Sequence, residues 1–264
     1  HLHLQVQRSA QLGSPTRPFH LCSLLRHRDD GISEYLVNGR PEVGETVEAA
    51  VVDPRLATPL HLPVGRQLTY RVEGPGLPPD SEISLQVELT LLGQFRLVSD
   101  SGASAAFEEN NGVLAFYDRQ GPRDRFLDIW LLANGMTPLS ESAVSWQDAP
   151  SAQLLPLGLL PRGILWFLRP LGRGLSSHYR RQLDPGQGVW HQQGQHELRL
   201  GGRVLRAETR SLIDHEQGFH IISCRFGSHS WQAQLTELGL AGDEGVPGWQ
   251  ISSNSDKNPL EGSS

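Results

Sequence analysis

The sequence has 264 residues, of which 38% are hydrophobic and 20% are charged, and this ordinary globular composition excludes a wholly disordered chain. The formal net charge of -6 indicates no basic surface, so we expect neither nucleic acid nor an anionic membrane as a partner. No run of about 18 apolar residues is present, so we predict no transmembrane segment. We expect a soluble protein, and the compartment stays open between the cytoplasm and export with a signal removed.

The chain divides into four predicted segments. Residues 1–31 form an irregular N-terminal arm, because Pro15 and Pro18 interrupt any regular element. A β-rich half over residues 32–145 follows, then a junction rich in Pro, Ser and Ala, a β-meander half over 164–252, and a flexible tail over 253–264. No helix is predicted. Strand-like runs in the N-terminal half cover residues 34–37, 66–73, 82–98, 112–117 and 125–132.

The C-terminal half carries the clearest pattern, because its turns fix one strand register. A two-residue turn at Gly201-Gly202 places Leu198 opposite Leu205 and Glu197 opposite Arg206, an opposite-charge pair across the hairpin. Upstream, a turn near residues 185–186 aligns Leu183 with Trp190, Tyr179 with Gly194 and Ser177 with His196. Downstream, loops at 214–217 and 228–229 place Ala207 opposite Cys224, Phe226 beside Trp231 and His220 beside Glu237.

This register separates an apolar face from a polar face. A slip of one residue in any hairpin would mix the two faces, so agreement across four turns supports the register. We therefore predict an all-β fold, an antiparallel meander that forms a lipocalin-like barrel or half-barrels, with two packed β-rich halves. The apolar face consists of Leu175, Tyr179, Leu183, Trp190, Leu198, Leu205, Ile222, Phe226, Trp231 and Leu235.

Several polar side chains fall on the same apolar face. His220 and Glu237 are predicted neighbours, and a carboxylate orients a histidine for acid–base work, although a structural pair explains them equally. His196 and Cys224 flank Ala207 and are either a nucleophilic pair or ordinary buried packing. The other polar residues on this face are Tyr179, Arg181 and Ser211.

Metal and cofactor motifs are absent from the sequence. It contains no His-Glu-x-x-His, no P-loop, no dinucleotide fingerprint and no Gly-x-Ser-x-Gly elbow, so we expect no metal and no organic cofactor. His1 would be a copper ligand only if it is a native terminus. Cys22 and Cys224 are too few for a disulfide framework and are either bridged or free. The oligomeric state is open.

One local pattern points to a known family. After the hairpins that begin at Tyr179, the chain continues Asp214-His215-Glu216-Gln217-Gly218, and Trp166-Phe167-Leu168-Arg169-Pro170 precedes them. This stretch resembles the superfamily of carotenoid hydratases, tocopherol cyclases and fungal Diels–Alderases, although Gln217 stands where that family usually has tryptophan. The resemblance implies lipocalin-like domains, with Asp214 and His215 in a segment that protonates or polarises a polyene or polyketide.

We therefore expect a cyclase, isomerase or hydratase that acts on a hydrophobic small molecule inside a β-barrel cavity. Two alternatives stay open, a non-catalytic carrier of a hydrophobic ligand and a β-sandwich module that binds carbohydrate or protein. The expected catalytic residues are Asp214, His215, His220 and Glu237, and the expected ligand-binding residues are Tyr179, Arg181, Trp190, His196 and Trp231.

Overall fold

The structure is a computed structural model that describes residues 6–11, 14–17, 20–29, 31–77, 80–140, 143–157, 174–200 and 203–240. Of the described residues, strands hold 58% and helices 10%, so the all-β prediction is confirmed. No helix in the described ranges has the length and apolar character needed to cross a membrane.

Within the described ranges, fifteen strands form one continuous sheet, and a separate two-stranded sheet joins β1 (Val6–Gln7) to β2 (Thr16–Arg17). In chain order the fifteen are β3 (Leu21–Arg26), β4 (Ser33–Gly39), β5 (Val47–Ala49), β6 (Arg66–Glu73), β7 (Ser81–Leu89), β8 (Phe95–Ser99), β9 (Ser104–Asn110), β10 (Val113–Gln120), β11 (Met136–Pro138), β12 (Ala143–Asp148), β13 (Ser176–Asp184), β14 (Val189–Leu200), β15 (Arg203–Asp214), β16 (Gly218–Phe226) and β17 (His229–Leu240). Their order in the sheet is β11-β10-β9-β8-β7-β6-β17-β16-β15-β14-β13-β12-β4-β3-β5.

The sheet is open, which corrects the closed barrel that was one of the two predicted forms. It is not closed into a barrel, because β11 and β5 each pair on one side only. Strands from both halves belong to the same sheet, since β6 pairs with β17 and β12 pairs with β13. The predicted irregular arm also contains a sheet strand, because β3 pairs with β4 and β5. All neighbours are antiparallel except β12 and β4, so the sheet is mixed.

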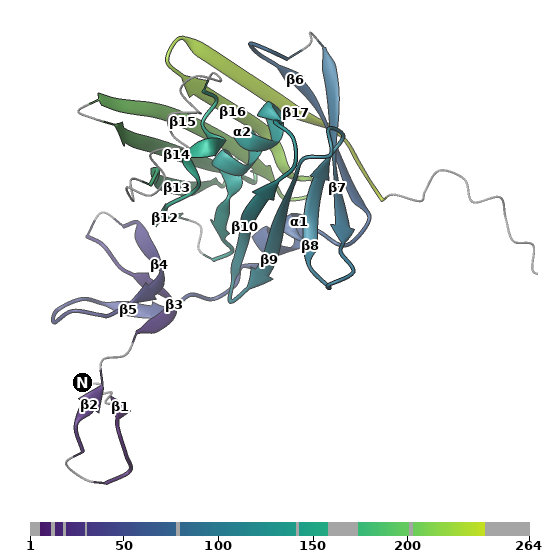
Figure 1. The fold of residues 1–264 in the computed structure, drawn as a ribbon. Coiled ribbons are helices and arrows are strands. Elements are labelled where there is room, and N and C mark those ends of the chain that lie inside the picture. The colour runs from purple at the N-terminus through teal and green to yellow at the C-terminus, as the bar shows by residue number, and fades with distance from the viewer. Residues whose placement is uncertain are drawn as a thin grey trace, which may run out of the picture.

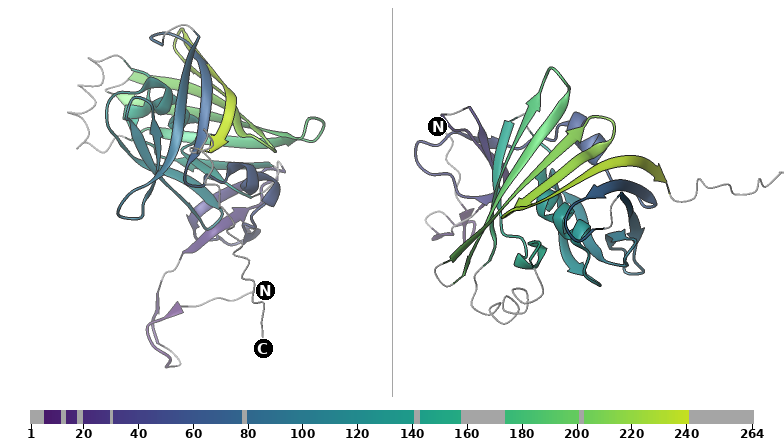
Figure 2. Two further views of the ribbon diagram at one scale, coloured as in Figure 1. Left: turned by 90° about the vertical axis from the view of Figure 1, so that its right-hand side faces the viewer. Right: turned by 90° about the horizontal axis from the view of Figure 1, so that it is seen from above.

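In the part of the chain that the structure describes, three short helices accompany the sheet: α1 (Pro54–Leu60), α2 (Arg125–Asn134) and the 3-10 helix η1 (Ala152–Leu154). The sheet curves so that α2 lies on its concave side (Figures 1 and 2). Residues 125–132 were predicted as a strand, and that prediction is wrong. Asp124 caps the helix by accepting a 2.9 Å hydrogen bond from the Leu127 amide. Because nine of the ten helix residues are buried, no polar stripe marks a helical period.

Trp130 of α2 lies at the centre of the largest hydrophobic core, fully buried. Its ring meets Phe116 of β10 and Phe219 of β16 edge-on, with centroids 4.9 Å and 5.2 Å away. Its indole Nε1 donates to the Tyr70 hydroxyl at 3.2 Å, and that hydroxyl donates to the Phe219 carbonyl at 2.7 Å. The core therefore ties the helix to strands on both arms of the curved sheet.

The predicted register is correct as far as β15. Leu198 pairs with Leu205, Leu183 with Trp190, and Arg206 Nε donates to the Glu197 carboxylate at 2.9 Å. Beyond β15 the prediction is wrong by two residues.

Ala207 pairs with Phe226 instead of Cys224, because β16 already starts at Gly218 and the pairing shifts between Leu212 and Ile213. The turn after β16 also differs, since Phe226 pairs with His229 instead of Trp231. A shift of two positions preserves the faces, so the predicted apolar face is confirmed. Leu183, Leu205 and Phe226 are partly buried in it, and its other members are buried.

Candidate functional site

His196 lies in a buried polar cluster between β13 and β15. Its Nδ1 is hydrogen-bonded to the Ser177 hydroxyl at 2.7 Å and its Nε2 to the Thr209 hydroxyl at 2.9 Å. Burial lowers the pKa of His196 to about 4, so the ring is neutral at pH 7. Both ring nitrogens are thus hydrogen-bonded to side chains of the neighbouring strands β13 and β15. This arrangement is typical of a histidine with a structural role.

The expected pair of His196 with Cys224 is not formed. Cys224 lies opposite Thr209, whereas His196 lies opposite Ala207. Burial raises the pKa of the Cys224 thiol to about 12, which removes its nucleophilic form. Cys224 is a buried free thiol and Cys22 an exposed one, which settles the question of the disulfide.

Tyr179 and Arg181 of β13 are buried against the end of α2 and against β11. The Tyr179 hydroxyl donates to the Leu132 carbonyl at 2.8 Å, and its ring stacks on Trp146 with centroids 5.2 Å apart. Arg181 Nη1 donates to the Pro138 carbonyl at 2.5 Å, and its Nη2 donates to the Ser140 carbonyl at 2.6 Å. These two side chains satisfy carbonyls that the helix end and the edge strand leave free.

Other inward polar groups complete the same arrangement. Gln192 Nε2 donates to the Ala133 carbonyl at 2.9 Å, and the Ser211 hydroxyl donates to Asn134 Oδ1 at 2.6 Å. Trp190 is buried in the core beside Leu183. Of the expected ligand-binding residues, Tyr179, Arg181, Trp190 and His196 are therefore core residues.

Asp214 and His215 lie in the turn between β15 and β16. Asp214 Oδ1 accepts hydrogen bonds from the backbone amides of Glu216 at 2.8 Å and Gln217 at 3.0 Å. Burial raises the pKa of the Asp214 carboxyl, but these amides and the nearby histidines outweigh it, and the pKa is lowered overall. His215 is exposed, 3.8 Å from the Asp214 carboxylate. Hydrogen bonds of this kind close a turn. They explain the Asp214-His215-Glu216-Gln217-Gly218 segment more simply than a catalytic role does.

His220 and Glu237 are not partners, and the predicted acid–base pair is wrong. His220 is the extra residue where Leu212 pairs with Ile221 but Ile213 pairs with Phe219. Glu237 sits beyond a second irregularity in β17, exposed and opposite Thr69 of β6. The irregularity in β16 shifts His220, and the one in β17 shifts Glu237. Neither side chain therefore takes the position that an uninterrupted strand would give it.

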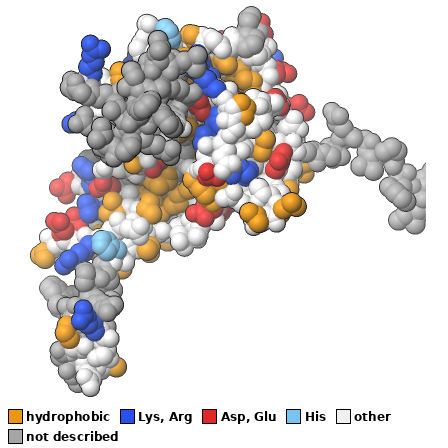
Figure 3. Space-filling view, viewed as in Figure 1, with side chains coloured by type: hydrophobic (Ala, Val, Ile, Leu, Met, Phe, Trp, Pro, Cys, Tyr) orange, Lys and Arg blue, Asp and Glu red, His pale blue; other side chains and the backbone are white. Residues whose placement is uncertain are grey.

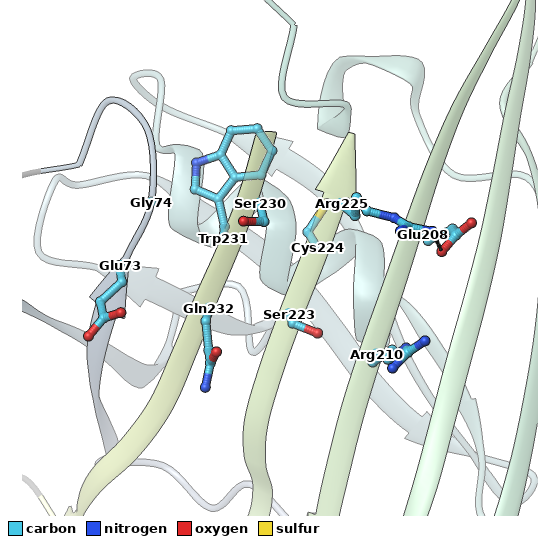
Figure 4. A pocket seen from close by; sticks show the side chains of 10 residues that line it. All are labelled: Glu73, Gly74, Glu208, Arg210, Ser223, Cys224, Arg225, Ser230, Trp231 and Gln232. Atoms are coloured by element: carbon cyan, nitrogen blue, oxygen red, sulfur yellow. Dashed lines mark hydrogen bonds and ion pairs between the residues drawn. The ribbon is translucent and has the colours of Figure 1, made fainter. Parts of the chain in front are cut away.

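An open groove lies on the convex, polar side of the sheet. It encloses about 470 Å³ and crosses β15, β16, β17 and the end of β6 (Figure 4). Arg225 Nη2 lies 2.7 Å from Glu208 Oε2 and forms an ion pair with it. Arg210 is exposed in the groove and makes no ion pair with any residue of the described ranges. The lining residues are Glu73, Gly74, Glu208, Arg210, Ser223, Cys224, Arg225, Ser230, Trp231 and Gln232.

One end of the groove is built by the loop after β6. Gly74 has a φ of +143°, and a Cβ there would lie 2.3 Å from Trp231 Cδ1, so only glycine allows this approach. Trp231 Nε1 donates to the Pro75 carbonyl at 3.0 Å, and Arg125 Nη1 donates to the same oxygen at 2.6 Å. Trp231, which was expected to contact a ligand, is therefore buried and supports the groove wall.

The sequence marks Glu208 and Arg210 only as members of the polar face. The alternation of polar and apolar residues along β15 places both side chains on the polar face. Glu73 and Gly74 could not be assigned to the groove in this way, because they reach it only through the long-range pairing of β6 with β17. Within the described ranges, no three His, Cys, Asp or Glu side chains are grouped as a metal site would require. His1 and residues 166–170 lie outside those ranges.

No protein-family model, curated protein or solved structure matches the chain. The resemblance of the segment that ends in Asp214–Gly218 to carotenoid hydratases and tocopherol cyclases therefore stays a prediction.

Proposed function

We propose that the chain is a non-enzymatic binding protein whose groove takes a polar, extended ligand with an anionic group. The observation that carries this proposal is Arg210, an exposed guanidinium inside a groove of about 470 Å³, without an ion-pair partner in the described ranges. A guanidinium binds a carboxylate, sulfate or phosphate through two parallel hydrogen bonds.

The surroundings of Arg210 support a polar ligand. Ser223 lies opposite it on β16, and Gln232 lies opposite Ser223 on β17, so a hydroxyl and an amide continue the row across three strands. These groups supply donors and acceptors from adjacent sheet positions, where backbone pairing holds them in place. The volume falls within the range typical of small-molecule sites, roughly 300–1,000 Å³.

The expected cyclase or hydratase has less support. Such chemistry requires an acid or base held free in an apolar chamber, whereas His196 is neutral and bonded at both nitrogens. Asp214 is engaged by two backbone amides, and Glu237 is exposed. The concave side, where a hydrophobic ligand would lie, carries α2 with Trp130 at its centre.

A binding screen with matched ligands tests this function. We expect oligosaccharides that carry carboxylates or sulfates to bind more tightly than their neutral counterparts, measured by isothermal titration calorimetry. Arg210→Ala should weaken that binding at least tenfold, since a charged hydrogen-bonded contact is worth roughly 1.5–3 kcal/mol. Arg206→Ala is the matched control, because Arg206 lies on the same strand and face but pairs with Glu197 outside the groove. The proposal would be contradicted if neutral oligosaccharides bound as tightly as the charged ones, or if Arg210→Ala bound the charged ones with wild-type affinity.

A further inference from the structure

The hairpin between β7 and β8 ends in an apolar tip, residues Leu89–Phe95. Leu91 is 107% exposed and Leu92 is 96% exposed. Leu89 and Phe95 at the base are also exposed. Hydrophobic side chains protrude at the lower right of Figure 3, where this hairpin lies in Figure 1. Two leucines with this exposure add nothing to the core, so folding does not account for them.

The tip is free of charge and its backbone is largely satisfied from within. Residues 89–95 read Leu-Thr-Leu-Leu-Gly-Gln-Phe, without an ionisable side chain. The Thr90 amide donates to the Gln94 carbonyl at 2.9 Å, and the Gly93 amide donates to the Thr90 carbonyl at 2.9 Å. The Gln94 amide donates to the Thr90 hydroxyl at 3.0 Å. If the tip enters an apolar medium, no charged side chain of residues 89–95 is removed from water, and few backbone groups are left without a partner.

The base of the hairpin is anchored in the body of the protein. The ring of Phe95 packs against Phe107 with centroids 5.7 Å apart, and Phe107 packs against Phe116 at 5.4 Å. Two further apolar side chains, Val64 and Leu240, are exposed at the same end of the sheet, where Leu240 pairs with Arg66 at the start of β6. The tip is thus a protruding apolar point on a fixed support.

We propose that this tip inserts into the interfacial layer of a lipid bilayer composed of zwitterionic lipids. A protruding pair of leucines suits a partner that deforms around it, and a lipid surface does so without a preformed pocket. The net charge of -6 disfavours anionic lipids. Two leucines bury less apolar surface than one myristoyl chain, whose membrane binding is itself marginal and reversible, so the docking is weak and reversible. This inference is independent of the groove and of its ligand.

Cosedimentation with phosphatidylcholine vesicles tests the inference. The protein should partition onto these vesicles to an extent that is insensitive to salt, since no charge contributes. Leu91→Ser combined with Leu92→Ser should weaken partitioning at least tenfold, because each leucine loses its apolar burial. Val43→Ser is the matched control, since Val43 is also 107% exposed but lies in the loop between β4 and β5, flanked by Glu42 and Glu45.

The double variant should keep the wild-type melting temperature, because neither leucine has core contacts. The inference is overturned if the wild type does not sediment with millimolar lipid, or if the double variant binds vesicles as the wild type does. It is also overturned if light scattering shows that the double substitution dissociates an oligomer while vesicle binding is unaffected. In that case the tip contacts a second copy of the chain.

Discussion

Gly194 of β14 lies directly opposite Thr209 of β15, and a Cβ atom added to Gly194 would lie 2.5 Å from the Thr209 hydroxyl oxygen. The same atom would lie 2.8 Å from His196 Nε2 and 2.9 Å from Tyr179 Cε1. Real Cβ atoms essentially never come closer than 3.0 Å to such neighbours. The missing side chain therefore leaves the space in which Thr209 and His196 form their hydrogen bond.

Gly194→Ala should destabilise the fold by about 1–3 kcal/mol, the usual cost of an added methyl group in a filled interior. Three side chains or the two strands must shift to make room for it. Urea denaturation measures the loss directly. Gly239→Ala in β17 is the control, because a Cβ there meets nothing within 4 Å. Equal stability of the two variants would show that the cluster around His196 is loosely packed.

The C-terminal hairpins show how far alternation predicts a fold. The register was correct where a tight turn joined clearly alternating strands, as between Glu197 and Arg206. It failed by two residues at β16, where His220 is an extra residue in a bulge. Phe219, Ile221 and Ile222 are apolar on both sides of this bulge, so nothing in the local pattern marks where the strand shifts.

The buried polar residues show why the candidate site could not be predicted correctly from the sequence. Tyr179, Arg181 and His196 were placed on the correct face, but the first two bond to carbonyls of Leu132, Pro138 and Ser140. The Leu132 carbonyl belongs to a helix that had not been predicted, and the other two belong to an unpredicted edge strand and to the residues just after it. Since backbone acceptors leave no mark on a sequence, polar residues that support the core looked the same as residues that bind a ligand.

Asp124 offers a direct test of helix α2. Its carboxylate accepts hydrogen bonds from the Leu127 amide at 2.9 Å and from the Ser101 hydroxyl at 2.8 Å, and it also contacts the Ser99 hydroxyl. Asp124→Ala should cost about 0.5–2 kcal/mol, because the first turn of the helix loses its cap. Asp124→Asn keeps a capping oxygen and should recover most of this loss. If the two variants are equally unstable in thermal unfolding, the cap does not hold the helix.

His196 makes stability depend on pH in a defined direction. Its pKa is lowered by burial from 6.5 to about 4, so the unfolded chain takes up a proton first as the pH falls. The stability from the neutral buried ring is therefore complete above about pH 6.5 and is lost progressively toward pH 4. The loss over this window should be roughly 3 kcal/mol.

Histidine titration by NMR measures this pKa in the folded protein. His196→Gln provides the stability control, because glutamine can hydrogen-bond with Ser177 and Thr209 but does not titrate. The difference in unfolding free energy between the wild type and His196→Gln should narrow as the pH falls from 6.5 to 4. A folded-state pKa of 6.5 or higher for His196 would mean that the ring is solvated and that the cluster is open to water.

Arg181 should resist even its most conservative replacement. Its two terminal nitrogens donate to the carbonyls of Pro138 and Ser140, and its guanidinium lies 5.6 Å from the centre of the Trp146 ring. A lysine ammonium is a single point donor and cannot span both carbonyls while stacking on the indole. Because the site is fully buried, a carbonyl that loses its donor finds no water in exchange.

Arg181→Lys should therefore lower the free energy of unfolding, measured in urea, by roughly 1.5–3 kcal/mol. The control Arg206→Lys, on the polar face, should change it by less than about 0.5 kcal/mol. A loss at Arg181 as small as that at Arg206 would show that the fork of hydrogen bonds does not hold the end of β11 against β13.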